Sequence, residues 1–550
     1  MSDSRLIPPR LRSPSPGAGA TYNGLALTFG ELSQMLRGAF RFGSYALLAA
    51  VLAGAWMLKD LHVEWLMAYL MFTLPAITII WVWSGSGVRG FPLLPLISLQ
   101  QLAIFVVPVL AATPATLLVS DSIMARCGVV MLLFYICLYA GWALSFSARL
   151  HERGSRWNLG IAEGQYSTER MLALAFLLLS SSAAFQLSLR TGFLFSIIPE
   201  SLVYGTPILR SLANAAGVLG GLIGAMMIGR GASFVQALIF WGLVTLFGIL
   251  LIADVLLSAV TGLVVAVALG LLFSRGRVPW LFLMLAFLIL GFFNQGKFAM
   301  RQKYWGDTGQ NRVQELSQLP SFFAEWAEVS SWYLFSDKQR SVYGDKSDKG
   351  QDLTDRINNL QNLTFVLNAI ERGKFELLEG KTYSLIPKLL VPRVLWPNKP
   401  RAHEGQVLLN LHFGRQQTVK QTEDTYIAWG LIAEAVGNFG WLFGPVSLGL
   451  VMGIFIGRIE SWSVRVRLFS VEGIMVKVLL MLISLSYEMV ASVLVTSVFQ
   501  SLVSSSAGGF FLYHWFGAGR QTNTPNQPQI ASAVMRGSKV SRKVSRYDHE

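Results

Sequence analysis

The stretch that decides the fold runs from Ser233 to Phe273 and reads "SFVQALIFWGLVTLFGILLIADVLLSAVTGLVVAVALGLLF". Its only ionisable residue is Asp254. A helix needs about 20 consecutive apolar residues to cross the hydrocarbon core of a bilayer. The stretch is therefore long enough for two spans joined by a short turn, and we place these spans at 233–249 and 252–273.

Apolar residues dominate the rest of the chain as well. Of its 550 residues, 53% are hydrophobic and 14% are charged, whereas a soluble domain carries about 25% charged residues. We therefore expect an all-α polytopic membrane protein. Its expected spans, about twelve in number by length and hydropathy, lie at 42–58, 64–83, 91–113, 124–147, 170–189, 209–228, 233–249, 252–273, 278–295, 438–457, 471–491 and 494–516. Counts of roughly eleven to thirteen also fit the apolar runs.

The distribution of basic residues predicts the orientation of the chain. A net charge of +14 would suggest nucleic-acid binding in a soluble protein, but Lys and Arg accumulate on the cytoplasmic side of membrane proteins. With the N-terminus inside, the short outer loops and outer span ends hold only Lys59, Arg126, Arg190 and Arg210. The reverse orientation breaks the rule. We therefore expect both termini in the cytoplasm and no nucleic-acid partner.

These patterns divide the chain into five parts. They are a disordered or amphipathic cytoplasmic tail, nine spans, one large outer loop, three spans and a disordered basic cytoplasmic tail, at 1–41, 42–295, 296–437, 438–516 and 517–550. The two cysteines, Cys127 and Cys137, lie in one apolar run. That setting indicates buried small apolar side chains, and neither a disulfide nor a metal site.

The large outer loop is much longer than a connection between two spans requires. Its 296–423 portion carries 18 Lys and Arg against 14 Asp and Glu, and loops of this length are usually functional or disordered. Apolar residues at helical spacing predict helices within 317–335 and 353–373. The polar residues 336–352 between them predict a flexible link.

One short stretch of the loop concentrates cations and prolines. It is "VPRVLWPNKPRAHEGQ", Val391 to Gln406, and it holds Arg393, Lys399, Arg401, Pro392, Pro397 and Pro400. Proline fixes φ and lowers the entropy lost when cations are held in place, and arginine binds phosphate with two hydrogen bonds. The cluster suits a phosphate or pyrophosphate, or else it is a solvated surface turn. Trp396 suits the membrane interface, and Arg210 is a second candidate anion contact.

A second segment places an ionisable residue at the membrane boundary. It is "DTYIAWGLIAEAVGNFGWLFGPVSLGLVMG", Asp424 to Gly453. Glu434 and Asn438 are four residues apart and share one helical face. A carboxylate at such depth is costly and is a functional candidate; the alternative is a carboxylate at a helix start that faces water. Three glycines would permit a helix break or tight packing, and they are Gly437, Gly440 and Gly444.

Motifs of soluble enzymes are missing from the sequence. We find no phosphate-binding glycine loop, no nucleophile elbow, no HExxH and no clustered Cys and His ligands. No energy-coupling domain is present either. We therefore expect substrates that are already at or in the membrane, and no cofactor or metal.

Taken together, the two segments resemble the Wzy-type oligosaccharide repeat unit polymerases, which include the O-antigen and exopolysaccharide polymerases. That family shares a Pro-Arg-x-x-aromatic-Pro-x-Lys-Pro element and a later Glu-x-x-x-Asn-Phe-Gly element. The corresponding residues here are Pro392, Arg393, Trp396, Pro397, Lys399, Pro400, Glu434, Asn438, Phe439 and Gly440. The resemblance covers roughly 60 residues, and the number of spans and the single large outer loop also agree.

The resemblance implies a membrane glycosyltransferase of the GT-C fold class in the bacterial inner membrane. Such enzymes polymerise repeat units linked to undecaprenyl pyrophosphate on the outer face, without nucleotide sugar or metal, and can work with a chain-length regulator. The implied pyrophosphate ligands are Arg393, Lys399 and Arg401, and the outer location of Arg210 makes it a further candidate for the pyrophosphate. The acceptor hydroxyl needs a base, for which Glu434, His403 and Glu404 remain open.

Other functions fit the same sequence. An O-antigen ligase has related chemistry and a different acceptor. A flippase for lipid-linked oligosaccharides would need polar residues along the interior of the bundle, and charges within the spans are sparse. A non-enzymatic assembly component would use the outer loop to recruit partners.

Overall fold

The computed structural model of the chain describes residues 27–58, 62–85, 87, 90–111, 116, 118–146, 154–158, 168–197, 206–255, 257–275, 279–305, 316–335, 358–391, 395, 396, 398–424, 427–484 and 489–516. Its regular structure within these ranges is helical, apart from three isolated β-bridges. The all-α prediction is therefore confirmed.

Ten helices of the described chain are long and apolar enough to cross a membrane, so the protein is a polytopic membrane protein. They are α1 (Phe29–Met57), α2 (Val63–Ser84), α3 (Leu93–Leu110), α5 (Asp121–Ser145), α7 (Thr168–Arg190), α10 (Thr206–Gly229), α11 (Phe234–Ile252), α13 (Trp280–Trp305), α20 (Leu431–Ser463) and α22 (Ala491–Phe516). Two further apolar helices are α12 (Leu257–Arg275) and α21 (Val471–Ser484). Each predicted span therefore coincides with a helix.

Three of the predicted boundaries between tail, spans and large loop differ from the ends of the helices. The N-terminal tail was expected to reach residue 41, but α1 begins at Phe29 because Thr28 and Glu31 form a capping box. Likewise α13 continues to Trp305 and α20 begins at Leu431, each inside the range predicted as loop. Hydropathy marks only the apolar part of a helix, and a capping box such as the one at Thr28 can start a helix in a more polar stretch. The predicted tail at 517–550 lies outside the described residues.

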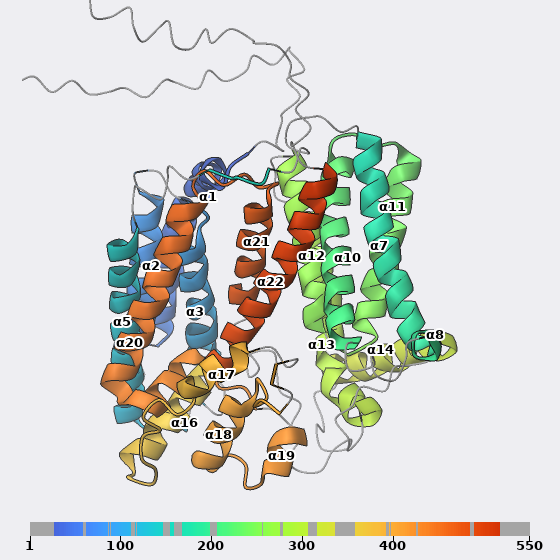
Figure 1. The fold of residues 1–550 in the computed structure, drawn as a ribbon. Helices are drawn as coiled ribbons and strands as arrows, with labels where there is room; N and C mark the ends of the chain where they lie inside the picture. Colours follow the sequence, from blue (N-terminus) through green and yellow to red (C-terminus); the bar gives the residue numbers. More distant parts are fainter. Residues whose placement is uncertain are drawn as a thin grey trace, which may run out of the picture.

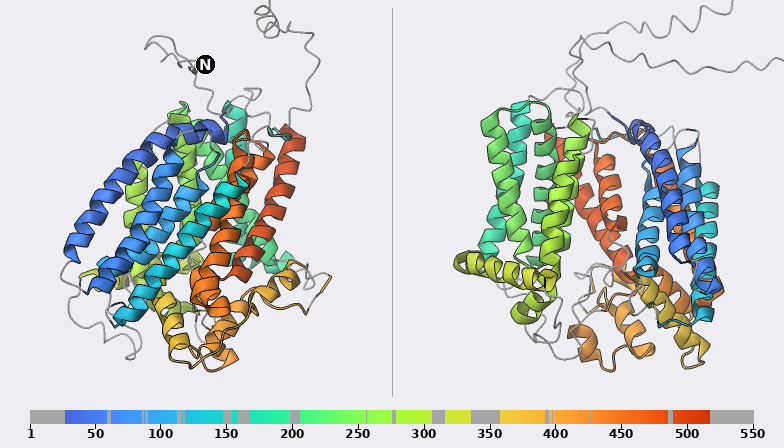
Figure 2. Two further views of the ribbon diagram at one scale, coloured as in Figure 1. Left: turned by 90° about the vertical axis from the view of Figure 1, so that its left-hand side faces the viewer. Right: turned by 180° about the vertical axis from the view of Figure 1, so that it is seen from behind.

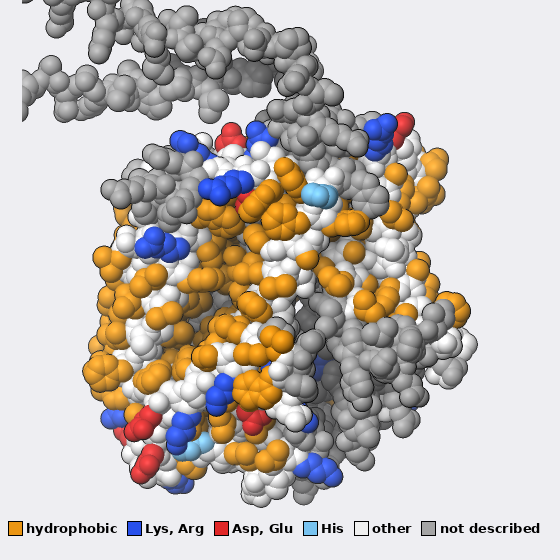
Figure 3. Space-filling model, in the orientation of Figure 1, with side chains coloured by type: hydrophobic (Ala, Val, Ile, Leu, Met, Phe, Trp, Pro, Cys, Tyr) orange, Lys and Arg blue, Asp and Glu red, His pale blue; other side chains and the backbone are white. Residues whose placement is uncertain are grey.

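The helices form two groups with a pair between them (Figure 1). The first group comprises α1, α2, α3, α5 and α20; the second comprises α7, α10, α11, α12 and α13. Helices α21 and α22 pack on each other between the groups, and Figure 2 shows the same separation from behind. On the face drawn in Figure 3, hydrophobic side chains cover the middle of the helices, and charged side chains gather towards both ends.

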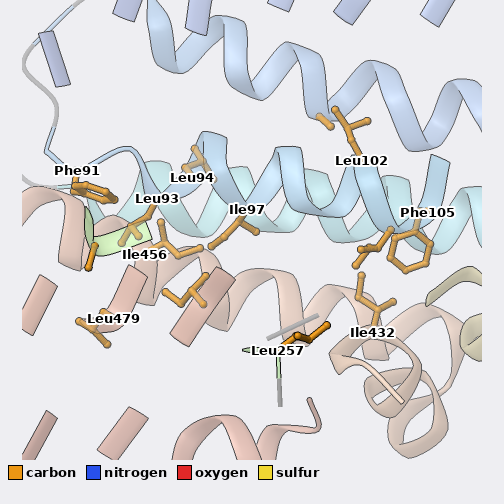
Figure 4. Packing of buried hydrophobic residues seen from close by; sticks show 14 of the residues in the cluster. Phe91, Leu93, Leu94, Ile97, Leu102, Phe105, Leu257, Ile432, Ile456 and Leu479 are labelled. Atoms are coloured by element: carbon orange, nitrogen blue, oxygen red, sulfur yellow. The ribbon is translucent and has the colours of Figure 1, made fainter. Parts of the chain in front are cut away.

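Small residues allow the closest helix contacts. Helix α20 lies against α5 where a Cβ on Gly449 would come within 2.6 Å of the Phe134 carbonyl oxygen, and one on Gly453 within 2.2 Å of the Leu138 carbonyl oxygen. Only glycine permits backbones to approach so closely. Along α3, Leu93, Ile97 and Phe105 extend the core towards α20 and α21, as Figure 4 shows.

The start of α1 and the segment between α20 and α21 meet at one end of the bundle, which we call the termini end. The backbone N–H of Phe29 donates to the Val466 carbonyl at 3.0 Å, and the N–H of Val471 donates to the Trp157 carbonyl at 3.1 Å. The described parts of the large loop lie at the opposite end, the loop end (Figure 1). This arrangement agrees with an even number of spans, and the predicted orientation makes the loop end the outer one.

A buried carboxylate ties the first group together at the termini end. Glu460 of α20 is fully buried. Its Oε1 accepts from the Leu94 N–H at 2.8 Å, and its Oε2 accepts from the indole N–H groups of Trp142 at 2.7 Å and Trp83 at 3.2 Å. One side chain thereby links α20 to α2, α3 and α5.

Replacing Glu460 with Ala should destabilise the protein, because three buried donors lose their acceptor and each unpaired donor costs about 1–3 kcal/mol. We expect a clearly lower unfolding temperature of the purified protein in detergent. Glu328→Ala is the control, since Glu328 is exposed on the loop end. Equal unfolding temperatures for the two variants would contradict the structural role of Glu460.

Candidate functional site

The described part of the large loop is helical and covers the loop end of the bundle. Its elements are η2 (Leu316–Gln318), α14 (Leu319–Phe335), α16 (Asn359–Glu371), η3 (Tyr383–Leu385), α17 (Ile386–Leu390), α18 (Glu404–His412) and α19 (Val419–Asp424). Helices α14 and α16 confirm the two helices predicted from apolar spacing. The predicted flexible link at 336–352 lies outside the described residues.

Helix α20 is broken at Gly440, which has φ 80° and ψ 173°. Only glycine adopts this backbone conformation readily. The break separates a short helix, 431–439, from the long one that follows. The two pack tightly, since a Cβ on Gly444 would lie 2.6 Å from the Ala435 carbonyl oxygen. Of the two possibilities that the sequence left open for these glycines, Gly440 shows the break and Gly444 shows the tight packing.

The short helix carries Glu434, which is fully buried. Its Oε1 accepts from the Thr382 hydroxyl at 2.7 Å, and its Oε2 accepts from the backbone N–H of Ala491 at 2.6 Å. Thr382 belongs to the large loop and Ala491 is the first residue of α22. The carboxylate therefore joins three segments that are far apart in the sequence. The alternative of a water-facing carboxylate at a helix start is wrong.

Asn438 completes the same hydrogen-bond network from the same helical face. Its Nδ2 donates to the Thr382 hydroxyl at 2.9 Å and to the Glu434 carbonyl at 2.8 Å. The backbone of the loop also pairs with this helix, because the Leu378 and Glu379 N–H groups donate to the Gly437 and Asn438 carbonyls at 3.0 Å each. The Glu-x-x-x-Asn pattern is thus a docking point for the loop.

The segment with the candidate base residues 403 and 404 also contacts the start of α22. The Ser492 hydroxyl donates to the Ala402 carbonyl at 2.9 Å, and Ser492 directly follows Ala491. His403 is half-buried, and its Nδ1 lies 2.7 Å from Gln406 Oε1. Glu404 is half-buried at the first position of α18. The structure therefore gathers the segments of Glu434, His403 and Glu404 around one helix start.

The predicted cations are only partly gathered. The Lys399 ammonium donates to the carbonyls of Leu389 and Val391 at 2.8 and 2.6 Å, so it ties its loop back onto α17. Arg401 is exposed, two residues before His403. Trp396 is 39% exposed and Pro400 is half-buried. The remaining motif residues, Pro392, Arg393 and Pro397, lie outside the described residues.

Arg210 does not lie with this group. It belongs to the second helix group, where it forms an ion pair with Asp254. The prediction that Arg210 joins Lys399 and Arg401 around one anion was based on its outer location alone. Residues on the same membrane face can be in different helix groups, and that is the case here.

Several residues of the site belong to no motif that the sequence analysis could single out. Arg415 lies 4.7 Å from the ring centre of Phe365 and 5.0 Å from that of Trp429. Burial lowers the pKa of Arg415 to about 10, so it stays cationic at neutral pH. Tyr383 stacks on Phe439 at 5.5 Å, and burial and then the nearby Glu434 charge raise its pKa well above the usual value.

A small cavity opens at the start of the short helix. It is lined by Gln101 and Phe105 of α3, Asn359 of α16, and residues 429–433. Backbone N–H groups of the first helical turn have no intrahelical acceptor, so a helix start offers donors and a positive potential. The arrangement can orient hydroxyl groups and stabilise negative charge at the loop end.

Comparisons of the chain with known protein families, with curated proteins and with solved structures find no match.

Replacing Gly440 with Ala should straighten or strain the break, because an L-residue in this conformation costs about 1–3 kcal/mol. We expect a lower unfolding temperature and a loop that detaches from the short helix, measured as faster proteolysis of the loop in proteoliposomes. Gly291→Ala is the matched control, since a Cβ there meets no atom within 4 Å. Unchanged stability and proteolysis of the Gly440 variant would argue against the break as a fixed feature.

Proposed function

We propose that this protein is a membrane glycosyltransferase that polymerises oligosaccharide repeat units carried on undecaprenyl pyrophosphate. The observation that carries the proposal is the convergence of the two motif segments. The Glu434 network and the 399–404 segment meet at the start of α22, at the end of the bundle predicted to face outwards. The product would be an O-antigen or exopolysaccharide made at the bacterial inner membrane.

The chemistry needs stabilised negative charge and a proton acceptor. The bond between the donor sugar's anomeric carbon and a pyrophosphate oxygen breaks, and a bond forms to the acceptor hydroxyl oxygen. The pyrophosphate leaves with the electron pair, and fixed cations lower the cost of its charge. Arg393 and Arg401 supply those cations in this proposal. The Lys399 ammonium holds the loop that carries them, because it donates to the backbone carbonyls of Leu389 and Val391.

We assign the base role to His403 and a positioning role to Glu434. Both carboxylate oxygens of Glu434 already accept short hydrogen bonds within a fully buried network. An imidazole whose Nδ1–H donates to Gln406 carries its lone pair on Nε2, where it can accept the proton of an acceptor hydroxyl. Glu404 follows His403 and is the alternative base.

The rest of the molecule supplies the setting of this reaction. Apolar surfaces between the helix groups suit the polyprenyl chain, and aromatic and polar groups of the loop suit sugars. A GT-C-like arrangement and a chain-length regulator as partner belong to the same proposal. A strain that lacks the protein should accumulate single repeat units on the outer side, whereas a missing ligase leaves long unattached chains and a missing flippase leaves units inside.

Replacing His403 with Asn should abolish the polymer, because the variant keeps a hydrogen-bonding side chain and loses the proton acceptor. We expect at least a hundredfold loss, in the range that general-base removal causes. The measurement is the polysaccharide ladder of a deletion strain complemented with each variant, at matched protein levels in the membrane. His62→Asn, on an exposed residue at the start of α2, is the control. A full ladder from His403→Asn would remove this residue as the base.

Variants around Glu434 separate positioning from chemistry. Thr382→Val removes one hydrogen bond to Glu434 and one from Asn438 but keeps the carboxylate. If Glu434 positions the loop, Thr382→Val and Glu434→Gln should shorten or thin the ladder to similar extents and lower the unfolding temperature together. A Glu434→Gln variant that folds with wild-type stability and makes no polymer would instead place Glu434 in the reaction.

A further inference from the structure

A second cationic group lies at the loop end of the other helix bundle. Asp254, at the end of α11, accepts from Arg190 Nη2 at 2.6 Å and also pairs with Arg210. Arg190 Nη2 reaches the Leu250 carbonyl as well, at 2.8 Å. The guanidinium of Arg301 donates to the Val255 carbonyl, one residue further along, at 3.2 and 3.3 Å. One carboxylate thus pairs with two arginines, and a third lies beside them.

Arg190 is held in an unusual state for a buried cation. Its side chain is 1% exposed, and its Nε and Nη1 atoms have no hydrogen-bond partner among the described residues. A buried charge with unused donors is costly unless a counter-charge completes it. Asp254 is shared between two arginines, so the pair of guanidiniums retains a net positive charge. An additional anion at Arg210 would balance that charge.

The path to this group runs over apolar surface. The Arg210 side chain is 32% exposed, and its neighbours Leu209 and Leu212 on α10 are 42% and 43% exposed. Phe193, in the short helix α8 (Phe193–Ile197) that follows Arg190, is 60% exposed. Exposed apolar side chains at the end of a spanning helix suit contact with lipid chains, which are as apolar as leucine. An anion that reaches Arg210 along this surface would therefore carry a hydrocarbon chain.

We propose that Arg190, Asp254 and Arg210 form a binding site for the phosphate group of a phospholipid in the leaflet at the loop end. Arg210 binds the phosphate oxygens directly, and Arg190 supports the charge from behind. Asp254 holds the two guanidiniums in place. This site is separate from the residues assigned to glycosyl transfer, so it stands or falls independently of the proposed function.

The test is a thermal-shift titration of the purified full-length protein in detergent after lipid removal. Three probes are added to separate samples: dioctanoyl phosphatidylglycerol, inorganic phosphate and neutral dioctanoylglycerol. We expect only the phospholipid to raise the unfolding temperature. Arg210→Gln should raise the lipid concentration at half-effect about tenfold or more, as expected when a charge-assisted contact is lost. Arg126 is the control. It pairs with Glu371 at the loop end of α5, and Arg126→Gln should leave the lipid concentration at half-effect unchanged.

Asp254→Asn should change the response to lipid in the opposite direction from Arg210→Gln. Without the carboxylate, the two arginines depend more on the added phosphate, so this variant should start less stable and gain a larger lipid-dependent shift. Stabilisation by inorganic phosphate alone would mean a free anion in place of a lipid. Equal shifts with the neutral lipid, or equal half-effect concentrations for wild type and Arg210→Gln, would overturn the site.

Discussion

The loop end depends on one buried carboxylate. Removing Glu434 from water costs several kcal/mol, and hydrogen bonds must offset that cost. The donors come from two other segments, the Thr382 hydroxyl of the large loop and the Ala491 N–H of α22. The short helix, the loop and the start of α22 must therefore be in register before the carboxylate is satisfied. The position of the 399–404 segment follows, because Ser492 holds Ala402.

Helix α20 carries a buried carboxylate at each end, and the two differ in kind. Glu460 accepts from two tryptophans and a backbone N–H within one helix group, a setting that serves cohesion. Glu434 lies where a loop, a broken helix and a third helix meet. Burial by itself is thus a poor guide to function, and the surroundings of each carboxylate separate scaffold from site.

Hydropathy and glycine placement carried the sequence predictions that succeeded. The spans followed from apolar length, and three glycines at the span entrance indicated a break or tight packing without saying which of them, Gly440, would carry the break. Thr382 could not be found in this way, because its role depends on Glu434, 52 residues away in the chain. The ion pair of Arg210 with Asp254 could not be predicted for a related reason. Charge counting assigns a membrane side, and only packing assigns a residue to one helix group.

The start of the short helix also has an electrostatic consequence. This helix begins at Leu431 and α22 begins at Ala491, so Glu434 lies in the first turn of one helix and accepts from the first N–H of the other. The backbone dipoles of both helices direct their positive ends towards the same region. Part of the attraction for anions at this end is therefore built into the main chain. A count of lysine and arginine residues does not include this backbone contribution, and substituting side chains does not remove it.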